Sequence, residues 1–126
     1  MKEVIKTDKA PAPIGPYSQA IKSGKLLFVS GQLAINPASG NLTMDNINEE
    51  ATQIMRNIGE ILKAAGMDYS HIVKTTIFLT NMNYFSAVNE VYGSFFKDAF
   101  PARETVQVSR LPKDVNIEIS VIASQE

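Results

Sequence analysis

The sequence predicts an α+β fold in which two helices pack on one face of a mixed β-sheet. Two stretches carry apolar residues at the spacing of amphipathic helices, and short segments with alternating or β-branched residues precede, separate and follow them. The chain has 126 residues, which is enough for one hydrophobic core and shows no repeat or linker that would divide it. We therefore expect a single domain over residues 1–126.

The first half of the chain predicts a hairpin followed by a helix. The segment "YSQAIKSGKLLFVSG" over 17–31 alternates, turns at Ser23-Gly24 and then runs apolar. After a loop rich in Pro, Ser, Gly and Asn, a helix begins near Asn46 and ends at Gly66. Its apolar positions follow the 3–4 spacing of one helix face and are Ile47, Ala51, Ile54, Met55, Ile58, Ile61, Leu62 and Ala65.

The second half predicts a strand, a helix and a final hairpin. The strand is "HIVKTTIFLT" over 71–80, which is β-branched and alternating. A second helix follows and stops before Pro101, and its apolar positions are Phe85, Val88, Tyr92, Phe95, Phe96 and Ala99. The segment "FPARETVQVSRLPKDVNIEISVIA" over 100–123 predicts two strands joined by a tight turn at "LPKD".

The final hairpin has one apolar and one polar face. Alternation assigns Val106, Val108, Ile117, Ile119 and Val121 to the face under the helices. It assigns to the opposite face Arg103, Thr105, Gln107, Ser109, Asn116, Glu118 and Ser120. A solvated face is usually rich in Lys and Glu, so short hydroxyls and amides favour a face covered by a second copy of the chain. The pattern alone leaves open the simpler alternative of a wetted sheet with small side chains.

The composition limits the class of protein. The chain is 44% hydrophobic and 20% charged, with 12 basic and 13 acidic residues and a net charge of −1. It has no basic run to follow a phosphate backbone and no apolar segment of membrane length, so we expect neither a nucleic-acid nor a membrane partner. The N-terminal segment is charged where a signal peptide is apolar, and with no cysteine the chain forms no disulfide and has no thiol nucleophile. We expect a cytoplasmic protein.

The pattern offers few candidates for chemistry. Arg103 can bind a carboxylate or phosphate through its planar set of donors, and Glu118 is the acid on the same predicted face. An ordinary Arg–Glu ion pair between strands is the alternative that spacing alone does not remove. The single histidine, His71, lacks a second histidine or a cysteine with which to bind a metal, and we expect a surface residue there. Gly31, after an apolar strand, indicates a bulge or a close approach to the backbone.

Several motifs taken together resemble one protein family. They are "IGPYSQA", "SGQ", "VKTT" and "PAR…V…LP", and with their flanking segments they span residues 10 to 123. In this order they are similar to the Rid family, also called YjgF, and specifically to its RidA branch. The resemblance implies a chorismate-mutase-like α+β fold, assembled as a homotrimer whose sheets form a central barrel, with ligand clefts between subunits.

The resemblance also implies a catalytic set. Arg103, in the "PAR" motif, is expected to bind the substrate carboxylate bidentately. Glu118, on the last strand, is expected to orient or activate the hydrolytic water and to relay protons. Tyr17, in the "GPY" motif, is expected to line the cleft from a neighbouring subunit.

Four further positions are implied to contact the substrate. They are Gly31, Thr105, Phe85 and Asn89. Many relatives have cysteine where this chain has Thr105, so thiol chemistry is excluded here, although a backbone contact would survive the change. Two other departures are Ser120, where relatives often have a second glutamate, and Glu104, where they have a smaller residue.

The activity implied by the resemblance is imine deamination. RidA proteins hydrolyse 2-iminopropanoate and 2-iminobutanoate, the tautomers of 2-aminoacrylate and 2-aminocrotonate, to pyruvate or 2-oxobutanoate and ammonia, without a metal or cofactor. Two alternatives belong to other classes: a regulatory protein that binds a ketoacid without turnover, and an endoribonuclease or translation inhibitor. The near-neutral charge and the single histidine argue against the second.

Overall fold

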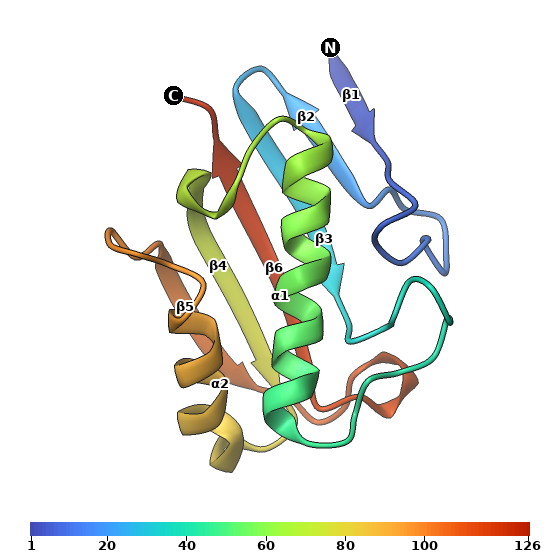
Figure 1. Cartoon of the computed structure of the whole chain (residues 1–126), viewed down its shortest axis with the longest axis vertical. Helices are drawn as coiled ribbons and strands as arrows, with labels where there is room; N and C mark the ends of the chain where they lie inside the picture. The colour runs from blue at the N-terminus through green and yellow to red at the C-terminus, as the bar shows by residue number, and fades with distance from the viewer.

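The computed structural model describes residues 1–126 and contains one mixed sheet of six strands with two α-helices on the same face (Figure 1). The strands are β1 Lys2–Ile5, β2 Ala20–Ser23, β3 Leu26–Gln32, β4 Ile72–Leu79, β5 Ala102–Gln107 and β6 Ile117–Ser124, in the spatial order β1-β2-β3-β6-β4-β5. The helices are α1 Ile47–Ala64 and α2 Phe85–Gly93, and the short 3-10 turns are η1 Tyr69–His71, η2 Met82–Tyr84 and η3 Pro112–Asp114. The predicted α+β class, with both helices on one face, is confirmed.

Helix α1 forms because its apolar stripe matches the apolar face of the sheet. Asn46 caps its start, and the Asn46 side chain accepts a hydrogen bond from the Glu49 N–H. The helix packs over β3 and β6, and its buried side chains join a core of 23 buried residues that includes Leu27, Ile77 and Ile119. The sheet is thereby covered on one face over its central strands.

The structure differs from the prediction at one strand and at the end of one helix. Strand β1 was not predicted, because it is a short edge strand in which only Ile5 is buried, so it carries no alternating pattern. Helix α2 ends at Gly93 instead of continuing to Ala99. Glycine weakens the helix there, and the next residues form i,i+3 turns, in which the Phe95 N–H donates to the Tyr92 carbonyl at 3.2 Å.

The predicted final hairpin is wrong. Strand β5 pairs in parallel with β4, and β6 pairs antiparallel with both β3 and β4, so β5 and β6 are not neighbours. A helix between two strands allows parallel pairing, and α2 connects β4 to β5 in this way. The segment after β5 then carries the chain past β4, and β6 fills the space between β3 and β4.

The predicted division of the two faces is therefore wrong for β5, whereas it is confirmed for β6, where Ile117, Ile119 and Val121 are buried in the core. Ile77 of β4 lies opposite Thr105 on one side and Ile119 on the other, so Thr105 shares the helix-covered face with the core. Phe78 lies between Val106 and Glu118 in the same way, and these two residues share the uncovered face. Parity across a hairpin requires direct pairing of its strands, which β5 and β6 do not have. The side chains on the covered face thus include Arg103, Thr105 and Gln107, and those on the uncovered face include Val106, Glu118 and Ser120.

The uncovered face of the sheet is partly apolar. Val4, Leu26, Phe28 and Val106 lie on it, and each keeps at least 40% of its surface exposed. Exposed apolar side chains that form a continuous patch usually mark an interaction site. That a second copy of the chain covers this face stays a prediction.

Candidate functional site

Arg103 lies on edge strand β5 with its side chain under α2. Its Nη1 donates to Asn89 Oδ1 at 2.7 Å, and its Cζ lies 5.3 Å from the ring centroid of Tyr92 and 5.7 Å from that of Phe85. Both rings attract the guanidinium through cation–π interactions, while the amide fixes its orientation. A hollow of about 300 Å³ adjoins it, and its lining residues are Asn89, Tyr92, Gly93, Phe100, Pro101 and Arg103. The guanidinium is thus held in place by neutral groups and is available to an anion.

Two hydroxyls lie close to this arginine along the sheet. The Tyr92 hydroxyl donates to Thr75 Oγ1 at 2.8 Å, and burial raises the pKa of Tyr92, an effect that the Thr75 hydrogen bond and the Arg103 charge partly oppose. Thr105, two residues after Arg103 on the same face, has a buried Oγ1 with no hydrogen-bond partner. A buried hydroxyl normally has a partner, and this one has none within the chain.

Glu118 lies on β6 and faces the other side of the sheet. It borders a hollow of about 360 Å³, whose lining residues are Ile14, Tyr17, Ser30, Gly31, Leu33, Pro112 and Glu118. No lysine or arginine pairs with this carboxyl group, and burial raises its pKa above the ordinary glutamate range. A carboxyl group with a raised pKa holds its proton at higher pH than an ordinary glutamate, which suits a group that both accepts and returns a proton.

Gly31 is required for the position of Glu118. It lies where the register of β3 shifts against β6, between Val29 and Gln32. A Cβ on Gly31 would lie 2.7 Å from Glu118 Cδ, which is too close for two carbon atoms in contact. The bulge and close approach that the sequence predicted at Gly31 are both present, and the approaching group is the Glu118 side chain.

Tyr17 enters the same hollow from the loop before β2. Its hydroxyl accepts a hydrogen bond from the Ile14 N–H at 3.2 Å, and the side chain is 45% exposed. Next to Gly31, the Ser30 hydroxyl donates to the Ser18 carbonyl at 2.6 Å. The loop that carries Tyr17 is thus tied to the start of the bulge that faces Glu118.

The residues implied by the sequence fall into two groups. Arg103, Phe85, Asn89 and Thr105 lie around α2 and β5, and we call them the arginine group. The glutamate group consists of Tyr17, Gly31 and Glu118. The two groups lie on opposite faces of one sheet, so the alternative of an Arg103–Glu118 ion pair within the chain is excluded.

Sequence reasoning missed several residues of both groups. Tyr92 was assigned to the core only, although its position three residues after Asn89 places it on the same side of α2, next to Arg103. Ser30 and Pro112 line the glutamate hollow. Nothing in the pattern pointed to Pro112, because the turn containing it was assigned to a tight hairpin.

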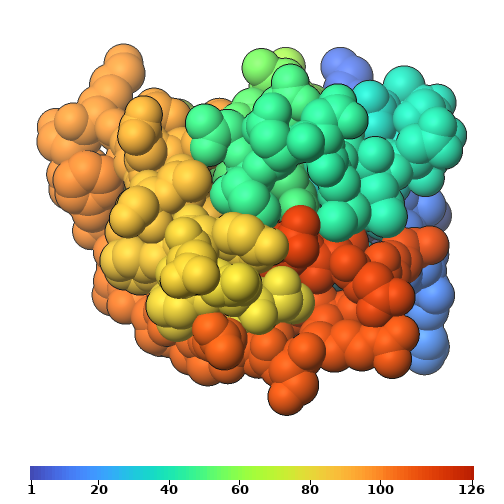
Figure 2. Space-filling view, turned by 90° about the horizontal axis from the view of Figure 1, so that it is seen from below, coloured from blue at the N-terminus to red at the C-terminus, as the bar shows by residue number.

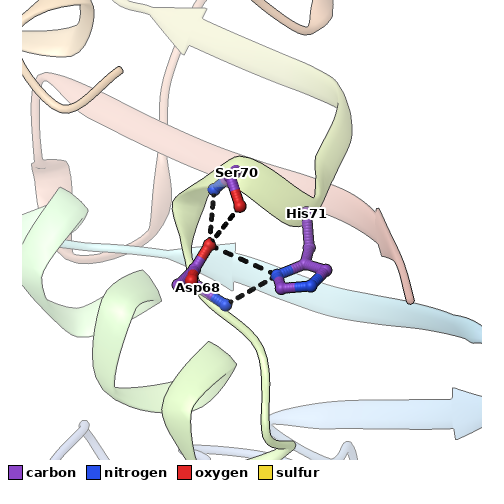
Figure 3. A network of polar contacts seen from close by, with 3 residues as sticks. All are labelled: Asp68, Ser70 and His71. Atoms are coloured by element: carbon purple, nitrogen blue, oxygen red, sulfur yellow. Dashed lines mark hydrogen bonds and ion pairs between the residues drawn. The ribbon is translucent and has the colours of Figure 1, made fainter. Parts of the chain in front are cut away.

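His71 has a structural role at a turn (Figure 3). Its Nδ1 accepts a hydrogen bond from the Asp68 N–H at 3.0 Å, and the Asp68 carboxylate accepts from the Ser70 N–H at 2.9 Å and from the Ser70 hydroxyl. The Ser70 hydrogen bonds lower the pKa of Asp68. His71 and Asp68 thus form a reciprocal cap at the start of η1.

The structure has no group of three or more His, Asp or Glu side chains arranged to hold a metal ion. Neither α-helix is both long and apolar enough to cross a lipid bilayer.

Comparison with known proteins finds full-length relatives. The family model described as Endoribonuclease L-PSP matches residues 7–125. A RutC family protein of Pyrococcus horikoshii is 51% identical over 126 residues, which is 100% of both chains. The 2-iminobutanoate/2-iminopropanoate deaminase of Homo sapiens is 49% identical over 125 residues, covering 99% of this chain and 91% of that protein. The crystal structure of E. coli TdcF with bound serine has a TM-score of 0.95 at 39% identity, covering 98% of this chain and 99% of that chain.

Proposed function

The chain belongs to the Rid (YjgF) family and is an enzyme of the deaminase type, and from this premise we propose that it hydrolyses 2-iminopropanoate and 2-iminobutanoate to pyruvate or 2-oxobutanoate and ammonia. One observation supports the proposal above the others. The chain has two incomplete half-sites, an arginine held by neutral groups and a carboxyl group with a raised pKa, and these are the groups that hydrolysis of an anionic imine needs.

The two half-sites meet only if two copies of the chain come together. We propose a homotrimer in which the arginine group of one subunit faces the glutamate group of the next, and in which the uncovered sheet faces enclose a central barrel. A contact between two different patches of the same chain generates a closed ring when its rotation closes. The exposed apolar side chains on the uncovered face, such as Phe28 and Val106, support this burial.

The proposed chemistry begins with the carboxylate of the substrate. Arg103 binds it through two parallel N–H donors, while the Tyr92 and Phe85 rings and Asn89 keep the guanidinium in place. The backbone of Thr105, two residues after Arg103 on β5, contacts the same ligand. The imine carbon is then held at a fixed distance from the neighbouring subunit.

Glu118 of the neighbouring subunit acts on the water. Its carboxylate accepts a proton from the water as the water oxygen bonds to the imine carbon, and it passes this proton to the imine nitrogen to give a carbinolamine. As the C–N bond then breaks, Glu118 accepts the hydroxyl proton and passes it to the nitrogen, so that ammonia leaves and the ketone forms. Tyr17 contributes a hydrogen bond at the rim of the cleft. Imines hydrolyse slowly in water unaided, so positioning and proton relay suffice for a useful acceleration.

A coupled assay tests the proposal. A threonine or serine dehydratase generates the imine, and ketoacid formation is followed with and without the purified protein. We expect acceleration with the wild-type chain and with Arg56→Ala, which removes an exposed arginine of α1, but not with Arg103→Ala. An absence of acceleration, or an unimpaired Arg103→Ala variant, would contradict the proposal. Tight ketoacid binding without turnover would favour the regulatory alternative.

The description of the family model favours a second candidate, an endoribonuclease. A net charge of −1 gives the chain little attraction for a phosphate backbone, so we expect no RNA cleavage above background. Cleavage of a labelled RNA that is lost in Arg103→Ala and Glu118→Gln would support the second candidate instead.

A further inference from the structure

Glu50 is a buried carboxylate that the proposed chemistry does not use. It lies in the first turn of α1 and is fully buried, with no lysine or arginine at ion-pair distance. Its Oε2 accepts hydrogen bonds from the backbone N–H of Asn116 at 2.9 Å and of Ile117 at 3.1 Å, and its Oε1 accepts from Asn116 Nδ2 at 2.8 Å. The carboxylate is therefore compensated only by N–H donors and by the N-terminus of its own helix.

All three donors belong to the two residues that precede Glu118. The Asn116 carbonyl also accepts from the Thr80 N–H at 3.0 Å, at the end of β4. Asn116 is thus held from α1 on one side and from β4 on the other. Figure 2 shows this end of the molecule, where the orange to red segment before β6 lies between the green start of α1 and the yellow start of α2. Pro112, at the other end of that segment, lines the same hollow as Glu118.

We propose that Glu50 is a positioning residue for Glu118, which fixes the start of β6 so that the Glu118 carboxyl group keeps its place in the hollow. The inference rests on the proposed function, because it assigns Glu50 to the same reaction. It adds a residue on the opposite layer of the fold that touches neither substrate nor water.

The two-subunit site gives this positioning its importance. In the proposed site the substrate is anchored by one subunit and Glu118 comes from another, so the position of Glu118 relative to the substrate depends on how rigidly its own chain holds it. Groups that act on a reacting atom need placement within about 0.5 Å, on rigid elements. Helix α1 has a fully buried stripe that includes Ile54 and Ile58, and it provides such an element.

Two substitutions separate hydrogen bonding from charge. Glu50→Leu removes both acceptor oxygens and leaves the Asn116 and Ile117 donors unpaired. Glu50→Gln keeps a carbonyl for the two backbone N–H groups, and the Asn116 side-chain amide can rotate to accept from the new NH₂ group. Since displacement by about 1 Å costs about 10²-fold in rate, we expect kcat to fall by roughly 10- to 100-fold in Glu50→Leu, with KM within about twofold of wild type. Glu50→Gln should keep kcat within about threefold.

Ile58→Ala is the control, since it removes a fully buried side chain of the same helix that lies outside both half-sites. All variants are assayed at temperatures equally far below their own Tm. We expect Ile58→Ala to lose Tm but to keep the wild-type kcat. If Glu50→Leu does not fold, Glu50→Asp replaces it, because a side chain shorter by one methylene cannot make all three hydrogen bonds.

A second measurement does not depend on turnover. The titration of the Glu118 carboxyl carbon, followed by NMR, should give a raised pKa in the wild type, Glu50→Gln and Ile58→Ala, and a pKa closer to the ordinary range in Glu50→Leu. If the wild-type protein fails to accelerate imine hydrolysis, the proposed function falls, while this titration still decides the role of Glu50. Wild-type kcat and Glu118 titration in Glu50→Leu, or in Glu50→Asp, would overturn the inference. So would a Glu50→Gln variant as impaired as Glu50→Leu.

Discussion

Replacing Gly31 with alanine adds one methyl group where the Glu118 side chain already lies. The new Cβ would be 2.7 Å from Glu118 Cδ and 3.0 Å from Cγ, whereas carbon atoms in contact are separated by about 3.5 to 4.0 Å. The carboxyl group therefore has to move by about 1 Å, and a displacement of about that size costs about 10²-fold in rate. Because a partly exposed side chain can yield, we expect a loss of only about 1 kcal/mol in the free energy of unfolding.

The assay for Gly31→Ala is ketoacid formation in the coupled system, with Tm measured alongside. Gly24→Ala is the control, because Gly24 has a φ of +60° and no atom within 4 Å of a new Cβ. Alanine there strains the turn between β2 and β3 by about 1 kcal/mol or more without touching either half-site. We expect Gly24→Ala to have a lower Tm than wild type and an unchanged kcat. Gly31→Ala should have a Tm similar to that of Gly24→Ala, but a kcat about 100-fold below wild type. A Gly31→Ala variant with kcat within threefold of wild type would show that the close contact between Gly31 and Glu118 does not set the position of the carboxyl group.

Two further predictions concern pH and packing. Because burial raises the pKa of Glu118, kcat should fall as the pH drops through that raised value, and this limb of the pH profile should be missing in Glu118→Gln. The raised pKa also affects stability: the stability contributed by protonated Glu118 is present below the unfolded-state pKa and is lost as the pH rises through the folded-state pKa. The Tm of Glu118→Gln should therefore be higher than that of the wild type at pH 7 but not at pH 4. In Gly59→Ala, the new Cβ would overlap the Tyr69 hydroxyl, which donates to the Met55 carbonyl at 2.8 Å. We expect a loss of about 1–3 kcal/mol in the free energy of unfolding, measured by denaturant titration, with unchanged kcat. An unchanged free energy of unfolding would contradict this packing.

The fold class could be predicted because the long amphipathic pattern of α1 and the β-branched strand β4 are local signals. The pairing of β5 could not be predicted, because the residue pattern of an edge strand does not indicate which strand it pairs with. For the same reason Arg103 was predicted on the wrong face. Arg103 and Val106 do lie on opposite faces, as predicted, but which face each one occupies depends on β4, which lies between β5 and β6.

The candidate site could likewise be predicted only in part. Residue identities came from motifs that are continuous in sequence, such as those around Tyr17 and Arg103. The separation into two half-sites depends on sheet order, and the sequence carries no direct signal of it. Glu50 was hidden for another reason, since an acidic residue in the first turn of a helix is usually explained by the helix dipole alone.

Mixing two inactive variants tests most directly whether the site is shared between subunits. Arg103→Ala and Glu118→Gln are unfolded together in equal amounts and refolded, so that the subunits of the proposed trimer combine at random. A complete site then needs an intact arginine group from one subunit and an intact glutamate group from the next, which about one interface in four provides in a closed ring. A site shared between subunits should recover about a quarter of the wild-type kcat per chain. Activity no higher than the average of the two separate variants would contradict it.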